Sequence, residues 1–300
     1  MALARSIASS SAPRDPRPDG DSGRISAGND SRLGRPSRVS TRALDDIDRR
    51  LGDHDREVLH VVARLRIASG DQLARALWEE EPGSDRRRRA RRALKRLTDW
   101  RVLNRLPRMV GGVRAGSSGF LYCVGPVGAR LLARYQTTPR RLHAPGDRYV
   151  AHTLAVAELV VGLHEAQRAG RLDVLGIETE PTCWRPFTGP MLARLVLKPD
   201  LFVRIGVGSY EDRWMVEVDM ATESPATVTR KARTYLAHYR SGTEQARHGV
   251  YPRVLWTAPD ERRAEIVGDA LAALPAASRR LFSVCTHDDA LARIAEEASS

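Results

Sequence analysis

The sequence predicts a mixed α and β chain with two domains: an α+β domain of three helices and a β-hairpin, then an α/β domain with a mixed sheet. Three observations indicate this division. Helical patterns dominate the first half, strand-like runs alternate with helical ones in the second, and a Pro-containing segment at residues 136–148 separates them. Charge is also split: residues 1–150 contain 31 Lys and Arg against 17 Asp and Glu, and residues 151–300 contain 18 against 20. This imbalance indicates that the first domain meets a polyanion and the second does not.

Residues 1–45 are rich in Ser, Pro, Gly, Arg and Asp, so we expect a disordered basic tail there. The first residues contain no apolar signal-peptide core, and no stretch approaches the roughly 18 apolar residues of a membrane span. Cys123, Cys183 and Cys285 lie far apart, without the spacing of a disulfide framework or a zinc site. The sequence therefore predicts a cytoplasmic protein without a membrane partner.

The first domain, expected at residues 46–135, begins with helices that follow Asp53 and Asp71, two residues suited to capping a helix. A third helix is expected from Arg86 to about Trp100, and residues 86–96 of it read RRRRARRALKR. Its apolar residues fall on one stripe, which leaves the cations outward. Phosphate neutralisation accounts for such a face, because like charges at helical spacing otherwise repel one another. We therefore expect DNA contacts from Arg86, Arg87, Arg88, Arg91 and Lys95.

Two strand-like runs, Val102–Met109 and Phe120–Val124, flank a Gly- and Ser-rich tip and predict a hairpin. A further helix is expected over Val127–Tyr135. Three helices followed by a basic hairpin resemble a winged helix-turn-helix domain. That resemblance implies that the third helix enters the major groove of double-stranded DNA, while Arg108 and Arg114 of the hairpin reach the backbone or the minor groove. The alternative is a solvated basic helix that holds the acidic stretch 79–81 of its own chain.

The second domain is expected at residues 149–295, after the linker 136–148. Its apolar patterns predict helices and strands in the alternating order of an α/β sheet domain. The helices are expected at His152–Glu165, Thr227–Tyr239 and Ala264–Leu274, and the strands at Val174–Glu180, Leu195–Leu197, Leu201–Val207, Trp214–Val218, Val254–Thr257 and Ser283–Thr286.

Two carboxylates stand at neighbouring strand ends in this domain: Asp200 after Pro199, and Glu217 in the run Glu217-Val218-Asp219. Such a pair can converge on Mg²⁺, which orients and activates water against a phosphate. The pattern resembles the PD-(D/E)XK nuclease fold, and the resemblance implies that Asp200 and Glu217 hold the metal. Asp219 stands where that motif has its lysine, so the chain departs from the pattern there.

Three further residues bear on this cluster. Lys231 on the following helix is our candidate for the missing catalytic ammonium, and Glu158 is a candidate auxiliary acid. His152 is either a ligand or an ordinary packed residue. A purely structural interpretation also stays open, in which Asp200 caps a turn and Glu217 pairs with an arginine. The site is then either an active endonuclease or a degenerate copy that retains the fold.

The winged-helix order, the linker, and residues 217–224 followed by Lys231 and Tyr235 together resemble the replication-relaxation family, over roughly residues 50–275. The resemblance implies a DNA-binding protein of a plasmid or integrative element, involved in plasmid replication and in DNA relaxation or transfer. Other replication or transfer proteins would be its partners. The alternatives are a Mg²⁺-dependent endonuclease that uses Asp200 and Glu217, and a transcriptional regulator of the winged-helix type.

Overall fold

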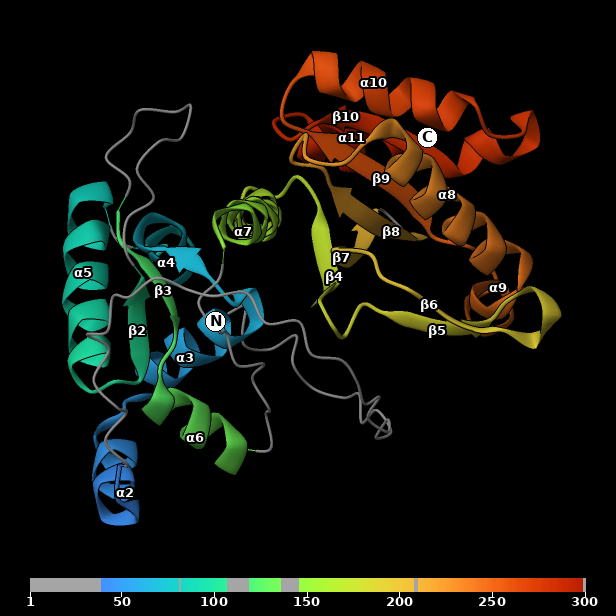
Figure 1. Cartoon of the computed structure of the whole chain (residues 1–300). Coiled ribbons are helices and arrows are strands. Elements are labelled where there is room, and N and C mark those ends of the chain that lie inside the picture. Colours follow the sequence, from blue (N-terminus) through green and yellow to red (C-terminus); the bar gives the residue numbers. More distant parts are fainter. Residues whose placement is uncertain (1–38, 81, 107–118, 136–145, 208–209, 299–300) are drawn as a thin grey trace, which may run out of the picture.

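The computed structural model describes residues 39–80, 82–106, 119–135, 146–207 and 210–298 (Figure 1). The first half of the chain forms helices around a small three-stranded sheet, in the order β1-β3-β2. The elements are α2 (Thr41–Arg50), α3 (Asp53–Leu65), β1 (Ala68–Ser69), α4 (Gly70–Leu77), α5 (Gly83–Asp99), β2 (Leu103–Leu106), β3 (Leu121–Val124) and α6 (Pro126–Arg134). The three helices and the hairpin expected from the sequence are therefore present in the expected order.

One expectation needs correction at its boundary. Helix α2 begins at Thr41, inside the segment that composition assigned to the disordered tail. Ser40 caps it by accepting a hydrogen bond from the Ala43 amide at 3.2 Å, and Leu44 is buried in the core. The remaining tail, residues 1–38, lies outside the described residues.

Two glycines allow α6 to pack closely on the segment that leaves α5. A Cβ atom on Gly128 would collide with the carbonyl of Val102, and one on Gly125 would collide with the carbonyl of Arg101. The Gly125 amide donates to the Val102 carbonyl at 2.8 Å. The sequence Gly125-Pro126-Val127-Gly128 thus fixes where the hairpin returns to the helices.

The second half contains a five-stranded mixed sheet in the order β10-β9-β8-β7-β4. Strands β4, β7 and β8 are antiparallel neighbours, whereas β9 and β10 run parallel to β8. A separate pair, β5 and β6, forms an antiparallel hairpin. The elements are α7 (Asp147–Arg168), β4 (Asp173–Thr179), β5 (Arg185–Thr188), β6 (Arg194–Leu197), β7 (Leu201–Val207), β8 (Tyr210–Val218), α8 (Pro225–Arg240), α9 (Thr243–His248), β9 (Arg253–Ala258), α10 (Glu261–Ala272), β10 (Phe282–Thr286) and α11 (Ala290–Ala298).

Helices cover both faces of this sheet, and β8 shows how its side chains divide. Trp214, Val216 and Val218 pack into the cluster that contains α7 and α11, whereas Met215 packs into the cluster that contains α8 and α10. Because successive side chains of a strand alternate between faces, Glu217 points to the same side as Met215, toward α8. The chain is thus a mixed α and β protein, as its patterns predicted.

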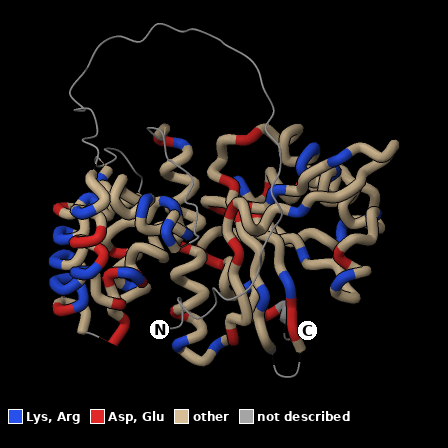
Figure 2. The backbone as a smooth tube through the Cα atoms, turned by 90° about the horizontal axis from the view of Figure 1, so that it is seen from below, with Lys and Arg blue, Asp and Glu red and all other residues tan. Residues whose placement is uncertain are grey.

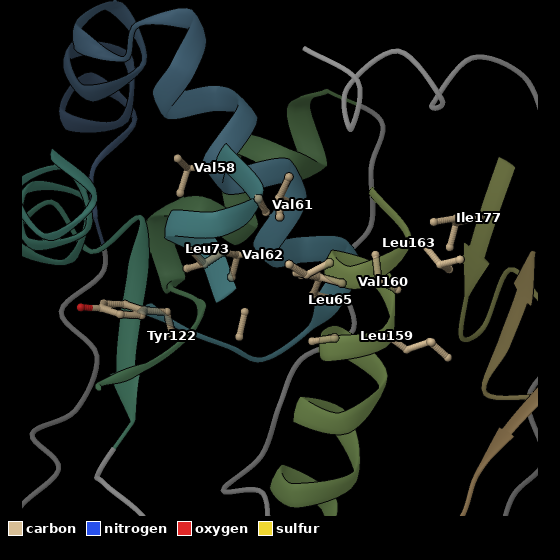
Figure 3. Close-up of a cluster of buried hydrophobic side chains, with 14 of the residues drawn as sticks. Val58, Val61, Val62, Leu65, Leu73, Tyr122, Leu159, Val160, Leu163 and Ile177 are labelled. Carbon is tan, nitrogen blue, oxygen red and sulfur yellow. The ribbon is translucent and has the colours of Figure 1, made fainter. Parts of the chain in front are cut away.

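Helix α7 joins the two halves of the molecule in one hydrophobic core. Leu159, Val160 and Leu163 lie between Leu65 of α3 and Ile177 of β4 (Figure 3). The expected linker, residues 136–148, overlaps this helix, since α7 begins at Asp147. The two halves were expected to be separate domains, but in the structure they share a core across α7.

Polar contacts reinforce the same junction. Arg66 forms an ion pair with Glu180 at 2.7 Å, and Thr179 donates to the Arg64 carbonyl at 3.1 Å. Arg75 of α4 forms ion pairs with two carboxylates of α7, at 2.6 Å each. The position of α5 relative to the sheet is therefore fixed by packing and by ion pairs together. In the described part of the chain, no helix is long and apolar enough to cross a membrane.

Candidate functional site

The two carboxylates expected to act together are neighbours in the structure. Leu201 of β7 pairs with Val216 of β8 in an antiparallel ladder. The next position of this ladder therefore places Asp200 opposite Glu217. The Asp200 amide donates to the Val216 carbonyl at 3.1 Å, which holds the start of β7 beside the end of β8. The antiparallel register therefore brings together two residues that are 17 positions apart in the chain.

Glu217 lies almost completely buried, and α8 supplies its partners. The Tyr235 hydroxyl donates to Glu217 Oε1 at 2.6 Å, and Lys231 Nζ donates to Oε2 at 3.1 Å. Lys231 and Tyr235 are four residues apart, so both reach the same carboxylate from one face of the helix. Burial, with a contribution from the Asp200 charge, raises the pKa of Glu217 to about 7 despite these donors.

This pKa gives the stability of the protein a pH dependence that Glu217→Gln removes. The folded state keeps the Glu217 proton to about pH 7, whereas the unfolded state releases it near its ordinary value of 4.5. Wild-type protein therefore loses stability through this group as the pH rises from about 5 to about 7. Relative to wild type, we expect the variant to gain about 2–3 kcal/mol between pH 5 and pH 8.

Urea denaturation at a series of pH values measures this difference. Burial also lowers the pKa of both His164 and His238 to about 4, so these two groups add a pH dependence of stability of their own, but it is the same in both proteins and cancels from the comparison. If the difference in unfolding free energy between Glu217→Gln and wild type did not change with pH, the buried position of Glu217 would be contradicted.

Asp200 is held by the backbone and by α7. The Val218 amide donates to Asp200 Oδ2 at 2.8 Å, and His152 Nε2 lies 3.1 Å from the same oxygen. The hydrogen bond to Asp200, working against burial, raises the pKa of His152. His152, which the sequence left open between ligand and packed residue, therefore belongs to this site.

Asp219, at the position of the motif lysine, has a different partner. Arg263 of α10 donates to both of its carboxylate oxygens, at 2.9 and 2.7 Å, and also to the Glu223 carbonyl at 2.7 Å. This bidentate pair neutralises Asp219 and ties α10 to the end of β8. The ammonium near the carboxylates comes instead from Lys231, which also contacts Glu223 at 3.0 Å.

Several of these residues, among them Glu217, Asp219 and Lys231, line a cavity of about 210 Å³ at the end of β8. Its walls carry both signs of charge, and His152 and Tyr149 also line an adjoining, smaller cavity that reaches Asp200 and Arg66. The residues lining the larger cavity are Arg148, Tyr149, His152, Glu217, Val218, Asp219, Met220, Thr222, Glu223, Lys231 and Trp256. Glu158, the expected auxiliary acid, is not among the residues that line either cavity, and it pairs with Arg75 at 2.6 Å.

The donor set of this cavity suits Mg²⁺ in one respect and opposes it in another. Carboxylate oxygens are the ligands that Mg²⁺ prefers, and the ion commonly uses only one or two of them beside water and phosphate. Lys231 already donates to Glu217 Oε2, so a cation bound at that oxygen would lie beside an ammonium of the same sign of charge. Among the described residues, no three His, Cys, Asp or Glu side chains are grouped so that they could hold a metal.

The second candidate site is the outer face of α5. Ala90, Ala93, Leu94 and Leu97 are buried, which turns the cations away from the core. The side chains of Arg87, Arg88 and Lys95 are 72%, 64% and 75% exposed. Figure 2 shows this helix as a column of blue segments at the left edge of the molecule.

The carboxylates that face α5 do little to neutralise it. Arg88 pairs with Asp85 at 2.7 Å and Lys95 with Asp99 at 2.7 Å, both at the surface, where such pairs contribute about 0–1 kcal/mol. Glu79 of the acidic stretch contacts Arg168 of α7 at 2.9 Å, so its carboxylate does not serve the α5 cations. The Glu79 carboxylate is therefore not part of an acidic stretch that neutralises α5, which was the alternative interpretation of this helix.

The expected DNA contacts of this half fall into three groups. Arg87, Arg88, Arg91 and Lys95 are exposed on α5. Arg86 is half-buried, and its guanidinium donates to the carbonyls of Trp78 at 3.1 Å and Glu79 at 3.2 Å at the end of α4. Arg108 and Arg114 lie outside the described residues. Arg105 was not among the expected contacts; it is exposed on β2, on the same half of the molecule, with its guanidinium 4.0 Å from the centre of the Phe120 ring.

Comparisons with known proteins give one match. A family model described as replication-relaxation matches residues 59–254, well over half of the 300-residue chain. The matched range includes α5, the hairpin, α7 and the cavity residues from His152 to Lys231. No curated protein and no solved structure matches the chain.

Proposed function

Since the chain belongs to the replication-relaxation family, we propose that it acts in plasmid replication and in DNA relaxation or transfer as a protein that binds double-stranded DNA. The order of α3, α4, α5 and the β2–β3 pair, with β1 completing a small sheet, supports a winged helix as the DNA-binding unit. In this arrangement α5 enters the major groove. Replication or transfer proteins of the same element are the further partners that we propose.

The observation that carries this proposal is the exposed cationic face of α5. Its cations project from a helix whose opposite stripe is buried, so the charge cannot turn inward. A row of exposed cations is favourable beside phosphates, because binding releases the counterions condensed on the duplex. Burial raises the pKa of Tyr122 on β3, and the charges of Arg105 on β2 and Arg91 on α5 both oppose that shift, so helix and hairpin present one cationic region.

The test is salt-dependent binding of the full-length chain to a fluorescent duplex, compared between wild type and an α5 variant with Arg87→Glu, Arg91→Glu and Lys95→Glu. A control triple, Arg171→Glu, Arg204→Glu and Arg293→Glu, changes the net charge by the same amount at positions away from α5.

We propose a second candidate function, cleavage of a phosphodiester bond at the cavity. The specific observation that favours it is the arrangement of Asp200 at the smaller cavity and of Glu217 and Lys231 at the adjoining larger one, with Asp200 and Glu217 opposite each other on neighbouring strands. Mg²⁺, when bound by Asp200 and Glu217, would supply Lewis-acid activation of water and phosphate. Lys231 would hold a positive charge beside the phosphate, and Tyr235 would orient the Glu217 carboxylate.

Nicking of a supercoiled plasmid measures this activity. With Mg²⁺ or Mn²⁺ in the buffer, we expect wild type to convert supercoiled to open-circular plasmid, and Asp200→Ala or Glu217→Ala to reduce the rate at least a hundredfold. Glu158→Ala is the matched control, since Glu158 lies on the same helix as His152 but outside the cavity. Equal rates for wild type and both cavity variants, or no nicking by wild type, would remove the cleavage function and leave the binding function in place.

A further inference from the structure

The near-neutral charge of the second half conceals a separation of its charges. Two segments, residues 181–199 and 224–253, contain nine of its 18 Lys and Arg residues but only one of its 20 acidic residues. That acid is Glu244, which is 1% exposed. The nine cations are Arg185, Arg194, Lys198, Arg230, Lys231, Arg233, Arg240, Arg247 and Arg253.

The fold brings these two segments together. Helix α8 packs against β6 and against α9, at the end of the molecule opposite to α5 (Figure 1). Three of the nine cations form ion pairs with carboxylates: Arg185 with Glu178, Lys231 with Glu217, and Arg253 with Asp212. The other six are exposed, and we call them the α8–β6 surface: Arg194, Lys198, Arg230, Arg233, Arg240 and Arg247.

The cations of this surface are less neutralised than those of α5. In the part of the chain that the structure describes, none of the six has a carboxylate oxygen within 4.0 Å. Arg230, Arg233 and Arg240 repeat at a spacing that places them on one face of α8, where like charges repel unless an anion meets them. Lys198 is held over the Trp184 ring at 4.5 Å, so its ammonium is positioned at the surface without being neutralised.

An apolar tip projects beside these cations. Met191 and Leu192, at the turn between β5 and β6, are 98% and 85% exposed. Their φ angles of 54° and 60° lie in the left-handed region, and the Gly189 amide closes the turn by donating to the Ala193 carbonyl at 2.8 Å. Apolar side chains flanked by arginine suit a duplex, whose phosphates meet the cations while its groove accepts apolar groups between base steps. An acidic protein partner offers no such groove.

We propose that the α8–β6 surface binds a second segment of duplex DNA, so that one chain holds two duplex segments at opposite ends. The inference rests on the proposed function for the identity of the ligand, but it uses different residues. Its six exposed cations form a face of the same type as the one that we propose binds phosphates on α5. This face lies on the second half of the chain, whose net charge is close to zero.

A bridging experiment with the full-length chain tests the proposal. One duplex is fixed to beads, and retention of a second, fluorescent duplex requires a protein that holds both. We expect wild type to retain the fluorescent duplex, and Arg194→Glu, Arg233→Glu and Arg240→Glu together to reduce retention at least tenfold. This variant should still bind a single duplex through α5, while the control triple defined above should bridge as wild type does.

The outcomes separate this inference from the proposed function. If the α5 variant loses single-duplex binding and the α8–β6 variant still bridges like the control triple, the inference is wrong and the proposed function stands. If the α5 variant binds normally and only the α8–β6 variant loses affinity, the assignment of DNA binding to α5 fails and the inference stands. Light scattering without DNA tests whether a second copy of the chain binds this surface instead. If wild type were a dimer and the α8–β6 variant a monomer, the surface would be a contact between two copies, and the proposal would be overturned.

Discussion

Replacing Arg87, Arg91 and Lys95 together by glutamate should weaken binding to duplex DNA at least a hundredfold near physiological salt. The three cations lie on the exposed face of α5, and each phosphate contact that is lost removes about 0.9 from the slope of log affinity against log salt concentration. The slope should therefore fall by about three. Fluorescence anisotropy over a range of salt concentrations measures affinity and slope together.

The control triple makes this result specific to α5. Arg171, Arg204 and Arg293 lie on the sheet half, and their reversal changes the net charge of the chain as much as the α5 variant does. A general effect of charge would lower affinity in both variants, whereas contact with phosphate lowers the slope by three in the α5 variant only. Equal slopes for the α5 variant and wild type would contradict the placement of α5 on DNA.

Leu163→Ala should destabilise both halves of the protein at once, by about 2–5 kcal/mol. Leu163 is 0% exposed and lies in α7 between the helical half and the sheet, so the cavity left by the substitution opens in the shared core. Amide hydrogen exchange measured by mass spectrometry follows α3 and β7 separately in one sample. We expect protection to fall by a similar factor in both.

Leu175→Ala provides the matched control, because Leu175 is the same residue type on β4 but is 44% exposed. Its substitution should cost less than about 1 kcal/mol. If Leu163→Ala reduced protection in the sheet half alone, the two halves would unfold independently and the shared core would not couple them.

Strong local patterns allowed much of the fold to be predicted. The buried stripe of α5 repeats at helical spacing, and β7 and the second half of β8 are mostly apolar, with one charged residue each, so their existence and order follow from the sequence. The pairing of Asp200 with Glu217 could also be predicted, since both stand at the ends of consecutive strands. Short or mixed elements could not: α9 has only six residues, and Pro186 makes β5 resemble a loop.

The rest of the site depends on contacts between distant segments. His152 reaches Asp200, and Arg263 reaches Asp219, across 48 and 44 positions of the chain, and no local spacing encodes either pair. The sequence does contain one signal of the shared core. Buried residues of α7 lie all around the helix, from Val150 to Ala166, and this pattern indicates a helix that is covered on more than one side. Net charge does not reveal the cations of the α8–β6 surface, because it averages them with the acidic residues elsewhere in the second half.

Helix α7 sets the distance between α5 and the cavity. It carries His152 at the cavity near one end and packs against α3 and α4 along its length, so α5 and the carboxylates belong to one rigid frame. A DNA-binding module on a loose tether would let its companion site sample many neighbouring base pairs. If α5 enters a groove as we propose, this frame determines which phosphate of the duplex can lie at Glu217, because the distance between α5 and the cavity does not vary.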